Sequence, residues 1–235
     1  IVPVEVAQKV FSDSNLPCIG KAGIREINKL ARDLEAASGV KFIHMEMGNP
    51  GLPAVQAGVE AQIKALQDGV AATYPPIDGV PAVKKEASRF IKNFLDLDVD
   101  AANCIPTVGS MQGAFASFMI CGHTNKEKNT ILFIDPGFPV HKFQTKILGM
   151  QMEAFDIYEY RGENLRNKLE SIFATGKIHS VLYSNPNNPT WVCLTDEELR
   201  IIGELANKYD VIVLEDLAYF GMDFRKDYSH PGVAP

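Results

Sequence analysis

The stretch "SVLYSNPNNPTWVCLTDEELRIIGELANKYDVIVLED", from Ser180 to Asp216, decides the fold. It contains two short apolar runs typical of buried strands, separated by a proline-rich polar corner and by a segment with helical apolar spacing. Thr195 and Glu198 have the spacing of a capping box, which marks the start of that helix. A strand, a helix and a second strand in this order predict two parallel strands.

The same alternation continues toward the amino terminus. Apolar runs predict strands, and segments with helical spacing lie between them. The expected strands cover residues 105–109, 130–135, 151–157, 180–185 and 211–216, and the expected helices cover 110–120, 141–148, 163–174 and 195–209. We therefore expect an α/β protein with a mostly parallel sheet and helices on both faces. Ligands of such sheets bind at the carboxyl ends of the strands, so the residues that follow each strand are the candidates for a site.

The first part of the chain is less regular. A helix is expected at 23–37, a short strand at 41–47 and a further helix at 54–69. A turn-rich stretch that is rich in glycine and proline follows the short strand and favours a boundary there. We expect an amino-terminal segment at 1–47 and a larger domain at 48–235.

The composition limits the class of protein. With 235 residues, 46% of them apolar and 22% charged, the chain resembles an ordinary soluble globular protein, and its formal net charge of -6 argues against nucleic acid as the main partner. The four cysteines lack the paired spacing of a zinc site, so we expect no metal. Because no apolar run is long enough for a membrane helix and no signal peptide is recognisable, we expect a cytoplasmic protein.

Two turns after predicted strands carry candidate ligand-binding residues. Gly109, Ser110 and Met111 open a helix, where small residues let backbone amides approach a phosphate, although such turns also carry glycine for steric reasons. Phe138 follows the strand at 130–135 and either stacks on a flat ligand ring or covers the edge of the core. His141, three residues later, is expected to be a solvated or capping histidine.

The polar corner and the next strand end provide further candidates. Asn185 and Asn188 each precede a proline, which stiffens the corner, and if one asparagine stabilises the turn the other has an amide available for a ligand. A rigid loop without any ligand contact explains the same pattern. Glu215 and Asp216 end a buried strand, where a charged carboxylate needs a metal, an arginine or a protonated ligand nitrogen beside it.

Taken together, these motifs resemble the class I and II aminotransferases, enzymes of fold type I that use pyridoxal 5′-phosphate; the resemblance runs from Gly23 to the end of the chain. It implies that segment 1–47 is part of a small domain and that 48–235 is the cofactor-binding large domain, truncated at its carboxyl end. The parent protein would transfer an amino group between an amino acid and a 2-oxo acid. A lyase or decarboxylase of the same fold, or a non-catalytic binding module, is the alternative.

The resemblance also implies contacts to the cofactor. Asp216 would pair with the ring nitrogen, and an ionised carboxylate there keeps that nitrogen protonated. Phe138 would stack on the ring, while Asn188 and Tyr219 would share the ring hydroxyl oxygen. The cofactor-binding set implied in this way is Tyr74, Gly109, Ser110, Met111, Phe138, Asn188, Asp216, Ala218 and Tyr219.

Two further matches imply a homodimer. Gly48 resembles the glycine whose backbone lines the substrate carboxylate site, and Tyr74 resembles the tyrosine that reaches the cofactor phosphate of the neighbouring subunit. If both carry over, the active site lies at a dimer interface.

The chain departs from the family at two places. Trp191 stands where the family usually has glycine, so either the loop follows a different path or the indole fills a local gap. The Schiff-base lysine of the family lies beyond the aspartate in a Ser-x-x-Lys context, which Lys226 does not match; we expect Lys226 to be a surface lysine. We therefore expect a fragment that lacks the catalytic residue, with the lysine beyond Pro235. A metal-dependent hydrolase using the two carboxylates at 215 and 216 would instead require magnesium.

Overall fold

The computed structural model describes residues 1–48 and 51–222. The chain divides into two compact units, Ile1–Thr73 and Tyr74–Pro235. The boundary expected after residue 47 stays a prediction.

The first unit is helical. It contains α1 (Val4–Asp13), η1 (Ile19–Lys21), α2 (Ile24–Ser38), α3 (Gln56–Gln67) and η2 (Val70–Ala72), and α1 packs against α2. The helices expected at 23–37 and 54–69 are confirmed. Gly39 ends α2 with a φ of 70°, a left-handed conformation that glycine adopts without steric penalty. The sequence pattern did not predict α1, whose first residue follows Pro3 without a side-chain cap.

The strand expected at 41–47 is wrong, because that segment lies beside α2 without a partner strand. A side chain of α2 provides a hydrogen bond to the backbone of this segment instead: the amide of Phe42 donates to the carboxylate of Glu35 at 2.9 Å. The ring of His44 lies between two carboxylates, with Nε2 3.4 Å from Glu35 and Nδ1 2.9 Å from Glu46. Hydrogen bonds from the His44 ring to the carboxylates of Glu46 and Glu35 raise the pKa of His44, and the contact with Glu35 links this segment to α2.

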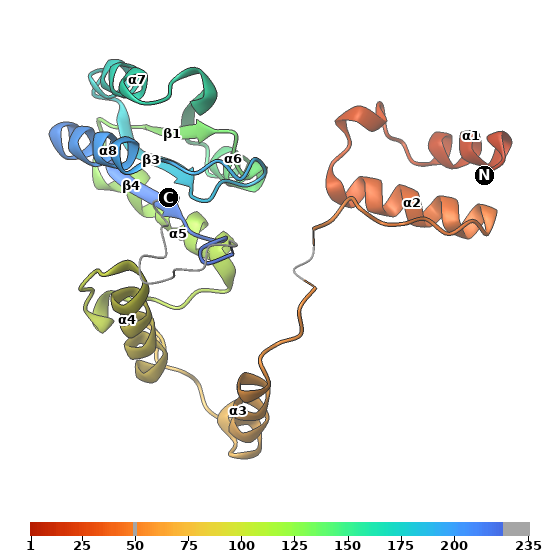
Figure 1. Cartoon of the computed structure of the whole chain (residues 1–235), viewed down its shortest axis with the longest axis horizontal. Helices are drawn as coiled ribbons and strands as arrows, with labels where there is room; N and C mark the ends of the chain where they lie inside the picture. The colour runs from red at the N-terminus through yellow and green to blue at the C-terminus, as the bar shows by residue number, and fades with distance from the viewer. Residues whose placement is uncertain (49–50, 223–235) are drawn as a thin grey trace. The chain divides into compact units, whose positions relative to one another are not determined.

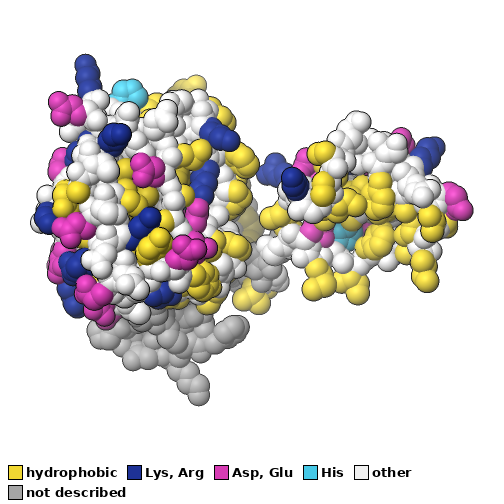
Figure 2. Space-filling model, turned by 90° about the horizontal axis from the view of Figure 1, so that it is seen from above, with side chains coloured by type: hydrophobic (Ala, Val, Ile, Leu, Met, Phe, Trp, Pro, Cys, Tyr) yellow, Lys and Arg dark blue, Asp and Glu magenta, His cyan; other side chains and the backbone are white. Residues whose placement is uncertain are grey.

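Hydrophobic side chains are exposed on the first unit (Figure 2), among them Ile24, Ile43 and Met45. An apolar surface of this kind is unusual on a soluble monomer and is typical of a surface that another segment or another chain covers.

The second unit contains a four-stranded parallel sheet with the order β2-β1-β3-β4 (Figure 1). Its strands are β1 (Thr130–Asp135), β2 (Gln151–Asp156), β3 (Ile178–Ser184) and β4 (Ile212–Asp216). The expected strands at 130–135, 151–157, 180–185 and 211–216 are therefore confirmed, with small shifts at their ends. In the register, Ser184 at the end of β3 lies beside Asp216 at the end of β4.

The strand expected at 105–109 is wrong. Gly109 already belongs to α5 (Gly109–Thr124), and Ile105 and Val108 are exposed. Pro106 has no amide hydrogen for a ladder, and among the described residues the segment pairs with none of the four strands. Short apolar runs form strands only when a neighbouring strand accepts their hydrogen bonds.

Helices cover both faces of the sheet, as predicted (Figure 1). On one face, α7 (Glu163–Phe173) and α8 (Asp196–Tyr209) pack against each other and bury Leu132 and Val181 from the strands. On the other face, α5 packs on β1 and β3, and α6 (Pro139–Ile147) packs on α5 and β2. The remaining elements of this unit are η3 (Ala101–Asn103), η4 (Ile157–Glu159) and α4 (Pro81–Leu95).

The strand order creates a crevice at one end of the sheet. The crossover through α6 leads from β1 outward to β2, whereas the crossover through α8 leads from β3 outward to β4 in the opposite direction. The carboxyl ends of β1 and β3 therefore flank a topological switch point, where open α/β sheets bind ligands.

The sequence also bears on membrane-spanning helices, disulfides and metal-binding clusters. No helix in the part of the chain that the structure describes is long and apolar enough to cross a membrane. The cysteines form no disulfide with one another. Within residues 1–48 and 51–222, no group of three or more histidine, cysteine, aspartate or glutamate side chains is arranged to hold a metal ion.

Candidate active site

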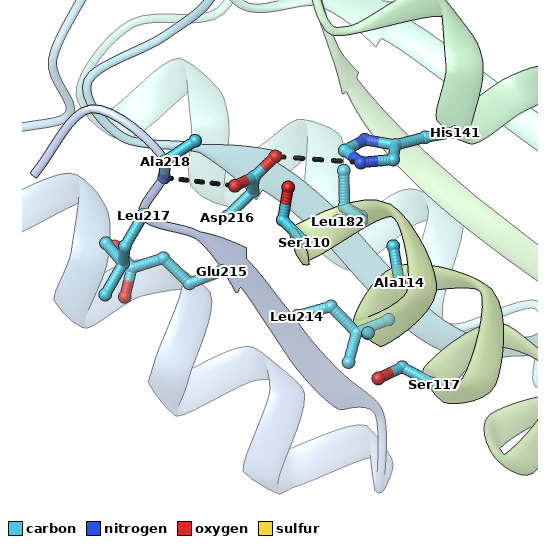
Figure 3. Close-up of a pocket in the computed structure, with 11 residues that line it drawn as sticks. Ser110, Ala114, Ser117, His141, Leu182, Leu214, Glu215, Asp216, Leu217 and Ala218 are labelled. Carbon is cyan, nitrogen blue, oxygen red and sulfur yellow. Dashed lines mark hydrogen bonds and ion pairs between the residues drawn. The ribbon is translucent and has the colours of Figure 1, made fainter. Parts of the chain in front are cut away.

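A pocket of about 390 Å³ opens at the carboxyl ends of the strands (Figure 3). Its walls come from the first turns of α5, from the end of β4 and from α6. The residues that line it are Ser110, Gly113, Ala114, Ser117, His141, Leu182, Leu214, Glu215, Asp216, Leu217 and Ala218. Ser110, Asp216 and Ala218 of the expected cofactor-binding set thus face one cavity.

Asp216 is the charged centre of this pocket. Its Oδ1 accepts a hydrogen bond from the amide of Ala218 at 3.1 Å, and its Oδ2 lies 3.6 Å from Nε2 of His141 (Figure 3). The amide bond fixes the carboxylate at the point where β4 ends. Because 3.6 Å is too long for a strong hydrogen bond, Oδ2 can still accept one from a ligand.

His141 lines the pocket, although the sequence pattern did not place it in the candidate site. It was expected to be solvated or capping, but it is 2% exposed, with its ring edge-on to Phe118 and Phe138 at centroid distances of 5.9 and 5.5 Å. Burial lowers the pKa of His141, and the charge of Asp216 opposes this shift. The ring is therefore a mostly neutral imidazole whose Nδ1 has no hydrogen-bond partner among the described residues. Its three-residue spacing from Phe138 was the available signal, because this spacing places both on one side of α6.

The start of α5 forms the opposite wall. Gly109 begins the helix with a φ of 72°, and nothing lies within 4 Å of the position that a β-carbon would occupy there. Val108 precedes it without a side-chain cap. No hydrogen bond satisfies the amides of Ser110 and Met111 among the described residues, so they are available at the positive end of the helix dipole. Gln144 of α6 donates to the carbonyl of Met111 at 2.8 Å and fixes this turn.

The asparagine corner follows β3 and is held by its own side chains. Asn185 accepts from the amide of Leu194 at 3.2 Å, and Asn187 donates to the carbonyl of Pro136 at 2.5 Å, which joins the ends of β3 and β1. The amide of Asn188 donates to Oγ of Ser184 at 3.3 Å. The Asn185–Pro186 and Asn188–Pro189 peptide bonds are cis. Asn185 and Asn187 are thus used by the framework, whereas no protein partner is found for the Asn188 side chain in the described part of the chain.

Trp191 keeps the backbone geometry that a glycine would favour. Its φ is 59°, and its amide donates to the carbonyl of Asn187 at 2.8 Å. The indole, 45% exposed, meets the ring of Tyr219 edge-on at a centroid distance of 5.8 Å. The indole thus contacts the turn after β4, while the backbone at position 191 has a left-handed conformation.

Glu215 and Asp216 point to opposite faces of β4, since successive strand residues alternate. Asp216 faces α5 and α6, and Glu215 points away from it (Figure 3). Glu215 accepts from Asn185 at 3.4 Å, and burial of its carboxyl group raises its pKa although part of the residue's surface remains open to solvent. This arrangement argues against a metal shared by the two carboxylates.

The other expected site residues lie apart from the pocket. Phe138 caps α6 and touches His141 without lining the cavity. Tyr74 is fully exposed in the loop before α4. Gly48 belongs to the first unit, and Lys226 lies outside the described residues.

Comparison with known proteins identifies relatives of the chain. The family model described as aminotransferase class I and II matches residues 40–234. The aspartate aminotransferase of Pyrococcus horikoshii is 25% identical over 232 residues, which are 97% of this chain and 56% of that protein. The glutamate-pyruvate aminotransferase of Escherichia coli is 29% identical over 184 residues, which are 77% of this chain and 43% of that protein.

Solved structures share the fold. The alanine aminotransferase of Pyrococcus furiosus superposes with a TM-score of 0.71 at 23% identity and covers 89% of this chain and 53% of its own. An archaeal alanine:glyoxylate aminotransferase gives a TM-score of 0.73 at 22% identity, with coverage of 88% and 52%. The chain spans about half the length of the relatives it matches.

Proposed function

This chain belongs to the class I and II aminotransferase family, and we propose that the protein containing it transfers an amino group between an amino acid and a 2-oxo acid, with pyridoxal 5′-phosphate as cofactor. The observation that carries the proposal is the pairing, across one pocket, of the Asp216 carboxylate with the uncapped amino terminus of α5. A ligand with a cationic ring nitrogen at one end and a phosphate at the other fits this charge distribution.

Ser110, Asp216 and Ala218 line the pocket, and the other residues of the expected set would contact the cofactor from beside it. The amides of Ser110 and Met111 would bind the phosphate, and Asp216 would hold the proton on the ring nitrogen. The side-chain amide of Asn188 and the hydroxyl of Tyr219 would bind the ring oxygen, and Phe138 would stack on the ring. When bound, the cofactor supplies an electron sink for the carbanion formed at the substrate α-carbon.

His141 has a role of its own in this proposal. Its buried ring lies against Asp216 and excludes water from that side of the carboxylate. A neutral imidazole there leaves the negative charge of Asp216 available to the ring nitrogen, whereas an imidazolium would neutralise it.

The remaining parts of the proposal rest on the family. The lysine that binds the cofactor is expected beyond Pro235, so this chain alone would bind the cofactor weakly and without a covalent bond. We propose a cytoplasmic homodimer in which Tyr74, fully exposed here, reaches the partner's site. Substrate contacts at Gly48 belong to the same proposal.

Binding to this chain tests the site. Pyridoxamine 5′-phosphate is the suitable probe, because it lacks the aldehyde that reacts with surface lysines, and calorimetry measures its affinity. Asp216→Asn should weaken binding roughly tenfold or more, since a charge-assisted hydrogen bond is lost. Asp156→Asn is the matched control: Asp156 also ends a parallel strand and also accepts an amide two residues on, at 2.9 Å. Equal effects of the two substitutions, or no saturable binding, would contradict the proposed site.

The reaction is tested on the full-length protein. An amino group passed from a donor amino acid to an added 2-oxo acid is the expected result. Loss of the donor with release of ammonia or carbon dioxide, and without transfer, would assign a lyase or a decarboxylase instead.

A further inference from the structure

Trp191 occupies a backbone position that disfavours tryptophan. Its φ of 59° lies in the left-handed region, where the β-carbon of a bulky residue approaches the following carbonyl and where glycine is free of strain. Nearly half of the residue is nevertheless exposed, so burial of the indole does not explain why it is tolerated. A strained residue of this kind points to a specific contact made by its side chain.

The contact joins two segments that both belong to the site. Trp191 is carried by a closed loop, in which its amide donates to Asn187 and the amide of Asn187 donates to Val192 at 3.0 Å. Asn187 is buried and hydrogen-bonded to the carbonyl of Pro136, so the loop is anchored to the end of the sheet. From it, the indole reaches the ring of Tyr219 with an interplanar angle of 69°, an edge-on arrangement that aromatic pairs prefer.

Tyr219 lies in a turn after β4, where the amide of Phe220 donates to the carbonyl of Leu217 at 3.0 Å and the amide of Met222 donates to the carbonyl of Tyr219 at 3.1 Å. β4 is one of the two edge strands of the sheet within the described residues. The indole is therefore the contact that ties this tyrosine ring to the asparagine corner.

We propose that Trp191 is a positioning residue that holds the Tyr219 ring, and through it the hydroxyl offered to the cofactor, in one orientation relative to Asn188. The inference rests on the proposed function, because Tyr219 and Asn188 are assigned to the same ring oxygen there. Trp191 itself does not contact the ligand. Its indole stabilises the bound arrangement by reducing the number of conformations that Tyr219 loses on binding.

Replacement by glycine separates this role from a purely structural one. Trp191→Gly removes the backbone strain, so the melting temperature should stay the same or rise. The affinity for pyridoxamine 5′-phosphate should nevertheless fall by roughly tenfold, a size typical of residues coupled within one contact network. Trp191→Phe keeps an aromatic edge and should retain part of the affinity. Tyr158→Ala, which removes another exposed aromatic side chain, is the control and should leave the affinity unchanged.

A double-mutant cycle with Tyr219→Phe decides the mechanism. If Trp191 acts through the hydroxyl of Tyr219, Trp191→Gly should weaken binding much less in the Tyr219→Phe background than in the wild-type chain. Because Trp191 is the single tryptophan of the chain, its fluorescence should also change on binding in the wild type. Additive losses, or unchanged affinity of Trp191→Gly, would overturn this inference. The proposed function would survive that result as long as Asp216→Asn and Asp156→Asn still differ.

Discussion

Glu198 should be the most sensitive charged residue of the second unit. It is 1% exposed, and its carboxylate accepts hydrogen bonds from Nε and Nη2 of Arg161 at 2.6 and 2.7 Å, from the amide of Gly162 at 2.9 Å and from the amide of Thr195 at 3.0 Å. Arg161 also donates to the carbonyl of Cys193 at 3.2 Å. One buried group thus joins the start of α8, the loop before α7 and the end of the asparagine corner.

Glu198→Gln tests this arrangement with little change in volume. The glutamine places an amide donor where a carboxylate oxygen accepts two hydrogen bonds, and it leaves the guanidinium without its counter-charge. Breaking a buried pair destabilises by about 3–5 kcal/mol, but the Arg161 side chain is 37% exposed and can turn to water, so we expect a loss of about 2–3 kcal/mol. For a unit of this size, that loss corresponds to a fall of about 5–10 °C in melting temperature.

Urea unfolding monitored by circular dichroism measures the loss, and a second variant on the same helix serves as the control. Glu204 pairs with Arg166 at 2.9 Å but is half exposed, so Glu204→Gln should change the free energy of unfolding by less than about 0.5 kcal/mol. In an Arg161→Met background, Glu198→Gln should destabilise much less than in the wild type. Equal losses from Glu198→Gln and Glu204→Gln, or no coupling to Arg161, would refute the reasoning.

The pH dependence provides an independent check. Burial raises the pKa of Glu198, but the hydrogen bonds from Arg161, Gly162 and Thr195 outweigh it and lower the pKa overall. A carboxyl with a lowered folded pKa contributes stability above its unfolded pKa of about 4.3, and this contribution is lost as the pH falls through the folded value. The stability difference between the wild type and Glu198→Gln should therefore be full near pH 7 and shrink in acid.

Two further predictions concern single positions. The two flanking glutamates raise the pKa of His44. The attachment of segment 40–47 to α2 should therefore be fully present below pH about 6.5 and be lost as the pH rises through the folded pKa. Hydrogen exchange of this segment should show that pH dependence, and His44→Gln should abolish it. Gly79 has a φ of 102°, and a β-carbon there would lie 2.5 Å from Cδ of Pro106. Gly79→Ala should therefore destabilise by about 2–3 kcal/mol in urea unfolding, and an unchanged midpoint would contradict the observed packing.

The errors of the sequence analysis share a physical cause. The strands between residues 130 and 216 were predictable because each apolar run is short, is bounded by polar turns and has a sequential neighbour to pair with. The runs at 41–47 and 105–109 have the same local composition, but strand formation depends on a partner elsewhere in the chain. The helix α1, which starts after Pro3 without a capping side chain, was not predicted.

The candidate site was predictable to a similar extent. Asp216 could be singled out because a carboxylate at the end of an apolar run was expected to need a compensating cation. The run was expected to form a buried strand, but β4 is an edge strand in which Ile212 and Val213 are 39% and 36% exposed. His141 could not be singled out, because its burial results from the packing of α6 on α5, which places the ring edge-on to Phe118 and Phe138. This tertiary packing places His141 beside the Asp216 carboxylate, and no local sequence pattern indicates this contact.

The asparagine corner has a left-handed backbone at position 191, although tryptophan replaces the usual glycine of the family there. The loop needs a left-handed residue at position 191, which explains the usual glycine, and the chain keeps that conformation with a tryptophan. A substitution that retains the backbone at the expense of strain is explained by what the new side chain contacts. Here the contact is Tyr219, on a turn of an edge strand, and the same corner already holds Asn188 beside Ser184 and thereby beside the end of β4. We therefore expect that the corner determines the relative positions of three residues assigned to one ligand ring, and that Trp191 extends this control to Tyr219, which lies in a turn after an edge strand.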